Sequence, residues 1–431
     1  MGTLHDTNPC HHSLGTIFAS IPDEVSHEAL LRLPRHLHGA LKTVSKSWSS
    51  AVSSRAFFEA REAAGAVEEW LFVLPEDPDQ GAFRAFDPNS YSWHAVPPVP
   101  GRSKTEGLSE FATVAAGGKM YVIGGRERVT SASPSGVSGV ETATACVRVF
   151  DPIAWRWEFC APMGEARISP AAEVLDGRYI VVTGGQGRHA FLRSAEMFDV
   201  LTEDWRSISA MHAARCGHRA VVLGGQLTVI AGEVERHDSM SADVMHLRHD
   251  GDGHARESTA SVEVYCRDAD RWDLVPNAWI DDSKIPCPMT VLGADLYAIH
   301  QTRLVVRDGA TGEWRKCGPV PSLHVSSSFG RQSSATHGVG MIAFGGKLFV
   351  MGGSRDAWGH GSSGGRVGLE EIFCWDPEEE GRRGREEEAR LPKGPMAPMF
   401  VRPTERLLNW TAVGGMGGGR GAILGCAVLR V

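Results

Sequence analysis

Two glycine pairs enclose an apolar run in Gly117-Gly118-Lys119-Met120-Tyr121-Val122-Ile123-Gly124-Gly125, and the arrangement returns in Gly345-Gly346-Lys347-Leu348-Phe349-Val350-Met351-Gly352-Gly353. Most copies of this pattern are followed by an Asp-containing turn and a tryptophan. Six tryptophans of this kind stand 42 to 96 residues apart: Trp93, Trp157, Trp205, Trp272, Trp314 and Trp410. A unit that recurs in this way is typical of repeat architectures, in which neighbouring units bury their apolar faces against one another.

Each full repeat predicts four short strands. The third repeat shows them clearly: an apolar run from Ala171 to Leu175, a turn at Asp176-Gly177, and a second run that ends at Gly184-Gly185. A third run from Ala195 to Asp199 leads through a turn into the strand that begins at Trp205. Four antiparallel strands repeated around an axis are typical of a propeller blade. The six tryptophans therefore predict an all-β six-bladed propeller over residues 69–431.

The first blade is expected to take one strand from the other end of the chain. Nothing strand-like precedes Trp70, so that blade has only three strands of its own. Residues 420–431 repeat the first-strand pattern after the last tryptophan. We expect this C-terminal strand to complete blade one, which removes the two edges of an open array. Blades four and five are expected to meet the hub differently, because Ala231-Gly232 and Ile299-His300-Gln301 replace their glycine pairs.

Residues 17–61 have a helical period instead. Ser20-Ile21-Pro22-Asp23 is typical of a helix start, with a capping serine and an early proline. Apolar residues at helical spacing predict three short helices, preceded by a disordered tail over residues 1–16. Because three short helices make a marginal core and Leu30 and Leu31 point to different sides, we expect an uncovered face that a partner buries. The alternative is a small helical cap that packs only on the rest of the chain.

Composition excludes several classes of protein. The net charge of -8 and the pI near 6.1 argue against a nucleic-acid-binding protein. No apolar stretch approaches the length of a membrane span, and the N-terminal residues lack the apolar core of a signal peptide. Nine cysteines are scattered singly with no Cys-x-x-Cys, so neither a zinc site nor a redox motif is indicated. We expect a reducing, intracellular location, in the cytoplasm, the nucleus or both.

Both parts of the chain resemble known families. Ile21-Pro22-Asp23-Glu24, the run from Ala29 to Pro34 and the run from Leu41 to Trp48 resemble an F-box. The glycine pairs, the spaced tryptophans and the turns Phe150-Asp151-Pro152 and Trp375-Asp376-Pro377 resemble kelch repeats. In this order the two parts resemble the plant F-box/kelch-repeat proteins of the SKP-interacting-partner type.

The resemblance implies a non-catalytic substrate adaptor of an SCF-type ubiquitin ligase. In that family the F-box docks on a SKP-type adaptor and, through it, on a cullin, while the propeller binds the protein to be ubiquitinated. No cofactor is implied. Carried over by position, the adaptor-binding residues are Pro22, Glu24, Leu30, Leu31, Val44 and Trp48. The structural kelch residues are the six tryptophans and the pairs Gly124, Gly125, Gly184, Gly185, Gly352 and Gly353. Ala29 and Ser45 depart from the family, where many members have cysteine.

Blade geometry predicts where the substrate binds. Connections between the second and third strands leave an up-and-down blade on one face, and three of them are long here: residues 126–145, 233–260 and 354–368. The helical region leads into the second strand of blade one, so we expect it on the opposite face. Candidate substrate contacts on the loop-bearing face are Arg126, Arg128, Arg188, His189, Arg236, His237, Arg355, Asp356 and Trp358.

A second class of function stays open. Residues 233–257 are rich in His and Asp, but their spacing matches no fixed metal motif, so we predict no metal site. Copper oxidases with a kelch fold need ligating tyrosines, and four of the five tyrosines here are in strand positions. No catalytic set can be assembled from the spacing of residues. The alternative is a kelch-fold metal-dependent enzyme or specifier protein with an incidental helical extension.

Overall fold

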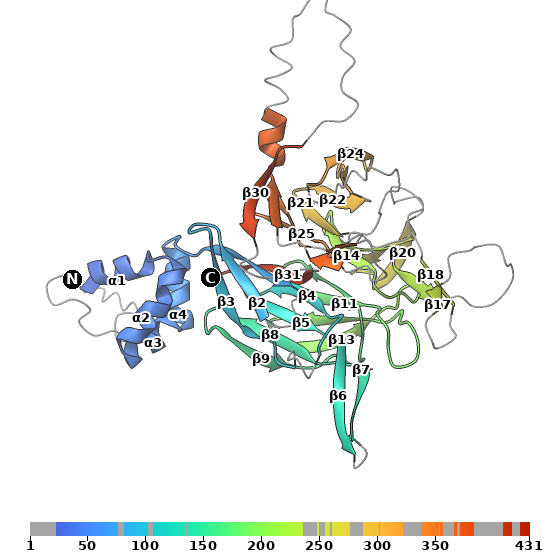
Figure 1. The fold of residues 1–431 in the computed structure, drawn as a ribbon, viewed down its shortest axis with the longest axis horizontal. Helices are drawn as coiled ribbons and strands as arrows, with labels where there is room; N and C mark the ends of the chain where they lie inside the picture. The colour runs from blue at the N-terminus through green and yellow to red at the C-terminus, as the bar shows by residue number, and fades with distance from the viewer. Residues whose placement is uncertain are drawn as a thin grey trace, which may run out of the picture.

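The N-terminal helices lie at one end of the molecule and strands form most of the rest, with one further short helix over residues 377–382, in the computed structural model (Figure 1). The described residues are 23–75, 82–101, 107–133, 136–235, 248–249, 255–258, 261–275, 288–300, 302–321, 338–352, 354–356, 366–368, 371–382, 408–415 and 423–431. The predicted disordered tail, residues 1–16, lies outside them. None of the described helices is long and apolar enough to cross a membrane.

The helical part contains four α-helices where the sequence predicted three. They are α1 (Asp23–Leu31), α2 (His38–Val44), α3 (Lys46–Val52) and α4 (Arg55–Ala63), with a 3-10 turn, η2 (Arg35–Leu37), before α2. The expected second helix is divided at Ser45, which has extended dihedrals of φ -161 and ψ 168. Its hydroxyl accepts a hydrogen bond from the backbone N–H of Trp48 at 3.2 Å and so caps α3.

Both adjacent leucines of α1 are buried. Leu30 and Leu31 are 3% and 5% exposed, and they pack in one cluster with Val52 and Phe57. Both leucines are therefore core residues, in a cluster with Val52 of α3 and Phe57 of α4, and their role in adaptor binding stays a prediction. The large apolar residues that the helical part exposes are Val25, Leu37 and Val44.

The strands form six antiparallel four-stranded sheets, one for each blade. Blade one is β31 (Ile423–Arg430), β1 (Glu69–Pro75), β2 (Ala82–Asp87) and β3 (Ser92–Pro98). Blade two is β4 (Ala112–Ala116), β5 (Lys119–Ile123), β8 (Val147–Asp151) and β9 (Arg156–Cys160). Blade three is β10 (Ala171–Leu175), β11 (Tyr179–Thr183), β12 (Ala195–Asp199) and β13 (Asp204–Ile208). Blade four is β14 (Arg219–Leu223), β15 (Gln226–Ile230), β19 (Val262–Cys266) and β20 (Arg271–Val275). Blade five is β21 (Met289–Leu292), β22 (Asp295–His300), β23 (Arg303–Arg307) and β24 (Trp314–Pro319). Blade six is β25 (Gly340–Phe344), β26 (Lys347–Met351), β29 (Glu371–Trp375) and β30 (Trp410–Gly415).

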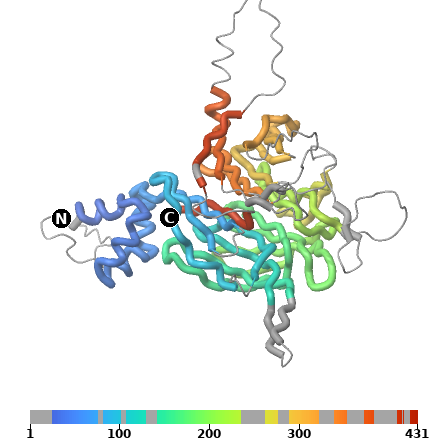
Figure 2. Tube along the Cα trace, in the orientation of Figure 1, coloured from blue at the N-terminus to red at the C-terminus, as the bar shows by residue number. Residues whose placement is uncertain are grey.

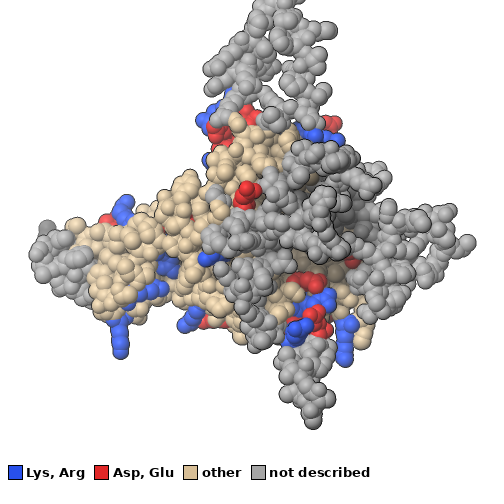
Figure 3. All heavy atoms as spheres, in the orientation of Figure 1, with Lys and Arg blue, Asp and Glu red and all other residues tan. Residues whose placement is uncertain are grey.

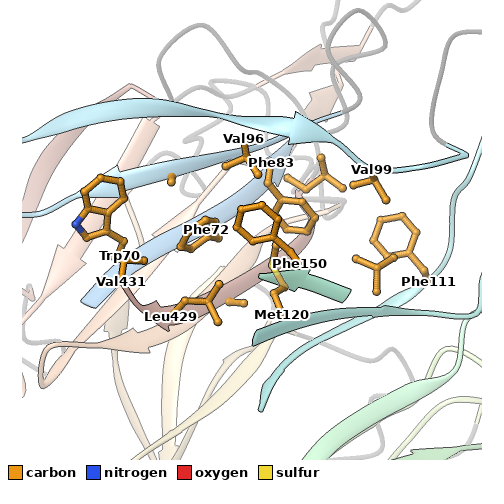
Figure 4. Close-up of a cluster of buried hydrophobic side chains, with 14 of the residues drawn as sticks. Trp70, Phe72, Phe83, Val96, Val99, Phe111, Met120, Phe150, Leu429 and Val431 are labelled. Atoms are coloured by element: carbon orange, nitrogen blue, oxygen red, sulfur yellow. The ribbon is translucent and has the colours of Figure 1, made fainter. Parts of the chain in front are cut away.

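The C-terminal strand closes the ring, which confirms the predicted fold class. β31 pairs with β1 from Glu69↔Arg430 to Leu74↔Gly425. The innermost strands contact one another in turn, from β31 through β4, β10, β14, β21 and β25 back to β31. The C-terminus therefore lies beside the N-terminal helices and strands (Figure 2). Figure 4 shows the core that results, in which Leu429 and Val431 lie among Trp70, Phe72 and Phe150.

Four of the six recurrent tryptophans hold their blade to the one before it. In every blade but the fifth, the tryptophan of the fourth strand pairs in register with an aromatic residue of the third, as Trp205 does with Phe198. In blade five its partner is Arg307. Indole N–H groups donate to a carbonyl of the preceding blade: Trp157 to Pro97, Trp205 to Ala161, Trp272 to Ser209 and Trp410 to Pro319, at 2.8 to 3.2 Å. Recurrence of tryptophan thus follows from one interblade contact that needs both a large apolar ring and a donor.

Glycine pairs end the second strands at points where backbones nearly touch. Gly124 and Gly125 have φ of 64 and 108, and a Cβ on Gly125 would lie 2.6 Å from the carbonyl oxygen of Ser109. In blade four, Ala231 and Gly232 have φ of 60 and 106. The expectation that blade four meets the hub differently is therefore wrong, because Ala231 accepts the left-handed conformation. In blade five a two-residue connection joins β22 to β23. Gly353 lies outside the described residues.

The three long connections between second and third strands each carry an extra small sheet. They contain β6 (Arg126–Ser133) with β7 (Gly136–Ala143), then β16 (Glu233–Glu235), β17 (Arg248–His249) and β18 (Ala255–Ser258), and finally β27 (Ser354–Asp356) with β28 (Arg366–Gly368). We call the side of the propeller that bears these sheets the loop face. The opposite side, which bears the turns between third and fourth strands, is the turn face.

Candidate interaction surfaces

The helical part rests on the turn face, as predicted, and one arginine makes most of the contact. Arg35 is 8% exposed. Its Nη2 donates to the carbonyl oxygen of Pro152 at 2.5 Å, in the turn between β8 and β9. Its guanidinium carbon lies 5.5 Å from the ring centre of Trp155 in the same turn, and its backbone N–H donates to Glu68 at 2.9 Å. A cation over an aromatic face is strengthened where both groups are removed from water.

A second buried arginine holds the helices together behind this contact. Arg61, 1% exposed, donates through Nη1 to the carbonyl oxygens of Leu31 and Leu33 at 2.7 and 2.5 Å. Its Nη2 donates to Ala66 at 2.6 Å and lies 3.6 Å from Glu68. Glu68 thus contacts both arginines, through the backbone N–H of Arg35 and the guanidinium of Arg61. Its other oxygen accepts from the indole N–H of Trp70 at 3.0 Å.

His38 lies between the two arginines and is neutral. Its Nδ1 is 3.0 Å from Arg35 Nη1 and its Nε2 is 3.2 Å from Arg61 Nη1. Burial, together with the charges of the two arginines, lowers the pKa of His38 to about 3. A neutral imidazole avoids adding a third positive charge to a buried group that contains one close carboxylate.

A histidine contact ties the helices to blade one. His36 Nδ1 lies 3.1 Å from Asp87 Oδ2, at the end of β2. Asp87 also accepts from the Ser90 hydroxyl at 2.6 Å and the Asn89 N–H at 2.8 Å. Burial opposes the charge on Asp87, but these hydrogen bonds outweigh it and hold the pKa of Asp87 below its usual range. The helices are therefore fixed to the turns of two neighbouring blades.

The residues predicted to bind an adaptor are placed very differently from one another. Pro22 lies outside the described residues, and Glu24 lies in α1. Leu30 and Leu31 belong to the core, and Trp48 is partly buried against it. Val44 is 60% exposed at the end of α2. Among the predicted residues with described side chains, Val44 is the one that offers an open apolar surface.

The loop face brings together charged residues of blade two. Arg126 Nε lies 2.9 Å from Glu110 Oε1, and Arg126 and Arg128 lie 3.7 and 3.8 Å from Glu141. Acidic neighbours therefore offset the charge of these two predicted contacts. Figure 3 shows the same mixture, with basic and acidic side chains next to one another where the β6–β7 hairpin leaves the propeller.

The remaining loop-face candidates fall into three groups. Arg188 and His189 are exposed at the tip of the connection between β11 and β12. Arg355 and Asp356 lie in β27. Arg236, His237 and Trp358 lie outside the described residues. Their role as substrate contacts stays a prediction.

Sequence reasoning missed two buried arginines that position the loop face. Arg167 and Arg215 are each 0% exposed and lie in the connections that lead into blades three and four. Arg215 donates to the Ala231 and Ser261 carbonyls at 2.8 and 3.2 Å, and its Nη2 lies 2.5 Å from Glu263. Arg167 repeats this pattern with the corresponding residues Gly184, Ser194 and Glu196. A sequence pattern could have identified this pair of residues. Each arginine stands four residues before the first strand of its blade, and each glutamate follows Ser-x.

Blade two reverses this arrangement. Leu108 stands at the position of the arginine, and Arg148 stands at that of the glutamate. Arg148 donates to the carbonyl oxygen of Pro100 at 2.6 Å and pairs with Glu127 of β6. The acidic partner therefore comes from the hairpin, so the base of the β6–β7 hairpin is tied to its blade by a nearly buried ion pair.

The described residues contain no group of three or more His, Cys, Asp or Glu side chains that could hold a metal ion. Most of the His- and Asp-rich segment 233–257 lies outside them. The predicted absence of a metal there stays a prediction.

Comparison with known proteins agrees with both halves of this geometry. The F-box domain family matches residues 18–59, and the Kelch motif family matches residues 107–164 and 169–212. The chain has the domain composition of an F-box/kelch-repeat protein. The resemblance drawn from the sequence is thereby confirmed, and the helical part is called the F-box below.

Relatives from Arabidopsis thaliana share this composition. The chain is 26% identical to F-box/kelch-repeat protein At1g16250 over 423 residues, which cover 96% of the chain and 97% of that protein. It is 30% identical to F-box/kelch-repeat protein At1g22040 over 42% of the chain and 44% of that protein. It is 29% identical to F-box/kelch-repeat protein SKIP30 over 43% of the chain and 51% of that protein. The chain therefore spans only about half the length of the latter two relatives.

Proposed function

We propose that this protein is a non-catalytic substrate adaptor of an SCF-type ubiquitin ligase. Its F-box docks on a SKP-type adaptor that is linked to a cullin, and its propeller holds a protein for ubiquitination. The location expected from the sequence, cytoplasm or nucleus, is part of the same proposal. One observation carries it: the F-box and the long hairpins occupy opposite faces of one ring, so two proteins can bind at once.

The structure changes which F-box residue tests this proposal best. Leu31→Asp would place a charge in the core and unfold the helices, because Leu31 is 5% exposed. Val44 is exposed, so Val44→Asp alters the surface and leaves the core intact. A matched control is Val275→Asp, on the outer strand of blade four, where the valine is 36% exposed.

The experiment is co-purification of the full chain with a recombinant SKP-type adaptor. We expect the wild type and Val275→Asp to bind, and Val44→Asp to lose at least about tenfold in affinity, since one central apolar contact is worth about 1.4 kcal/mol or more. No binding by the wild type would overturn the proposal. A stoichiometric metal ion in such a non-binding protein would support the enzyme or specifier alternative instead.

We also propose that the substrate binds the loop face. Long loops on a rigid ring are where binding residues usually lie. Proximity labelling with and without the F-box would identify proteins that accumulate when they are not degraded. Replacement of the β6–β7 hairpin by a short turn should then reduce capture of such a protein without weakening adaptor binding. If capture is unchanged after all three long connections are replaced, the substrate does not bind the loop face.

A further inference from the structure

The F-box is fixed to the propeller by side chains that reach from one part to the other. Arg35 is the clearest case, because its Nη2 reaches 117 residues along the chain to Pro152 and its face covers Trp155. The last strand of the ring adds a second link, in which the backbone of Val431 pairs with that of Glu68 in both directions, at 2.8 and 3.2 Å. Arg430 adds an exposed ion pair with Glu62 of α4 at 2.6 Å.

The turn of blade two is shaped to receive this arginine. Asp151 accepts from the N–H groups of Ile153 and Ala154 at 2.7 and 3.0 Å, which leaves the carbonyl oxygens of Pro152 and Ile153 directed outward. Both face Arg35 Nη2, at 2.5 and 3.4 Å. Trp155 has a φ of 59, and its ring packs edge to face on Trp70 with centroids 6.3 Å apart.

Equivalent turns of other blades do not offer the same surface. Tyr91 stands at the position of Trp155 in blade one and is 73% exposed, and Glu203 stands there in blade three. A guanidinium that leaves water needs both acceptors and an apolar cover. The turn of blade one repeats the Asp hydrogen bonds, because Asp87 accepts from the Asn89 and Ser90 N–H groups. Of these three turns, however, only that of blade two carries a tryptophan, and its ring is packed on Trp70, so the azimuth of the F-box on the ring follows from the sequence of this turn.

We propose that Arg35 and Trp155 lock the F-box onto the rim of blades one and two, so that F-box and propeller move as one rigid body. Arg35 is then a positioning residue, which fixes the direction of the adaptor-binding surface relative to the loop face. Only the consequence for ubiquitin transfer rests on the proposed function. The lock itself is a property of the free chain and can be measured without any partner.

The test measures the distance between the two parts in the full-length chain. Fluorophores are placed through noncanonical amino acids at Ala40 in α2 and Ala190 on the loop face, both of which are exposed. Single-molecule energy transfer is recorded for the wild type, Arg35→Ala, Trp155→Ala and the control Arg32→Ala. Arg32 is three residues from Arg35, but its side chain is 64% exposed and pairs with Glu28 of α1.

We expect one narrow population for the wild type and for Arg32→Ala. Arg35→Ala and Trp155→Ala should each give a broad or shifted distribution. Arg35→Lys should restore the narrow distribution only in part, since an ammonium keeps the charge but loses the planar contact with Trp155. Trp155→Ala leaves the F-box sequence intact, so it separates loss of the lock from unfolding of the helices, which circular dichroism monitors.

Two results would overturn the lock: a broad distribution in the wild type, or distributions for Arg35→Ala and Trp155→Ala that match that of Arg32→Ala. Adaptor affinity is measured on the same variants and should change less than about threefold, since Arg35 is buried away from Val44. A wild type that is rigid but does not bind the adaptor would refute the proposed function and leave the lock standing.

Discussion

Single residues hold this propeller together mainly through backbone groups of the neighbouring blade. Gly184, at the end of a second strand, lies against the carbonyl oxygen of Arg215 in the next connection. Its own carbonyl accepts a hydrogen bond at 2.9 Å from Arg167, the buried arginine of the preceding connection. Side chains that contact backbone tolerate little displacement, because the backbone cannot move without moving its strand.

Gly184→Ala tests the close approach. A Cβ there would lie 2.5 Å from the carbonyl oxygen of Arg215, so we expect a loss of about 3 kcal/mol in the free energy of unfolding. The control is Gly177→Ala, which has a similar φ of 65 but an open surrounding and should cost about 1 kcal/mol. Urea unfolding measures both. Equal losses would show that the conformation, and not the contact, requires glycine.

Arg215→Met tests the buried clamp. It leaves Glu263, which is 0% exposed, without its buried cation, and we expect a loss of about 3 kcal/mol. Arg267→Met removes an ion pair with Asp176 whose side chains are 40% and 46% exposed, and it should cost less than about 1 kcal/mol. If thermal unfolding shifts equally for both variants, the clamp contributes no more than a surface pair.

The exposure of a strand's side chains depends on the position of the strand in its blade. The outermost strands β9, β13 and β20 expose most of their residues, whereas the innermost strand β10 exposes none and carries Glu173. Burial raises the pKa of Glu173 to about 7, although a hydrogen bond from the Val174 N–H, at 2.9 Å, opposes the shift. A carboxyl group on an innermost strand therefore makes the stability of that strand sensitive to pH.

The direction of the pH effect on stability follows from which state of the protein binds the proton. Between its ordinary pKa of 4.5 and about 7, the folded state keeps the proton of Glu173 while the unfolded chain loses it. The stability that this group contributes is therefore present below pH 4.5 and is lost as pH rises through 7. We expect Glu173→Gln to be more stable than the wild type at pH 8 and close to it at pH 4.5. Melting temperatures across this range provide the measurement, and parallel curves for the two proteins would contradict the assignment.

At the scale of the whole molecule, ring closure and F-box attachment depend on the same strand. β31 completes blade one through seven register pairs with β1, and its last residues lie against the F-box. Leu429 is 2% exposed in the core between blades, whereas the neighbouring Arg430 side chain is 51% exposed. The two residues therefore separate closure of the ring from the surface link to α4.

Leu429→Ala tests closure. We expect a loss of about 3 kcal/mol, as for other buried leucines, and faster hydrogen exchange in β1 and in the F-box helices. Arg430→Ala removes only the exposed pair with Glu62 and should leave exchange in β1 unchanged. If exchange rises in β31 alone, the ring and the F-box are not coupled through this strand.

The sequence alone determined the six blades, the order of the two parts and the closing strand. These features follow from local sequence patterns, because the strand period, the glycine pair and the tryptophan recur from blade to blade. Three features became known only from the folded structure: the burial of Leu31 in the core, the ion pair of Arg126 with Glu110, and the hydrogen bond from Arg35 to Pro152. Each of these depends on residues brought together from distant points of the chain, and the free energy of burying a charge or a side chain is set by neighbours that no local pattern specifies.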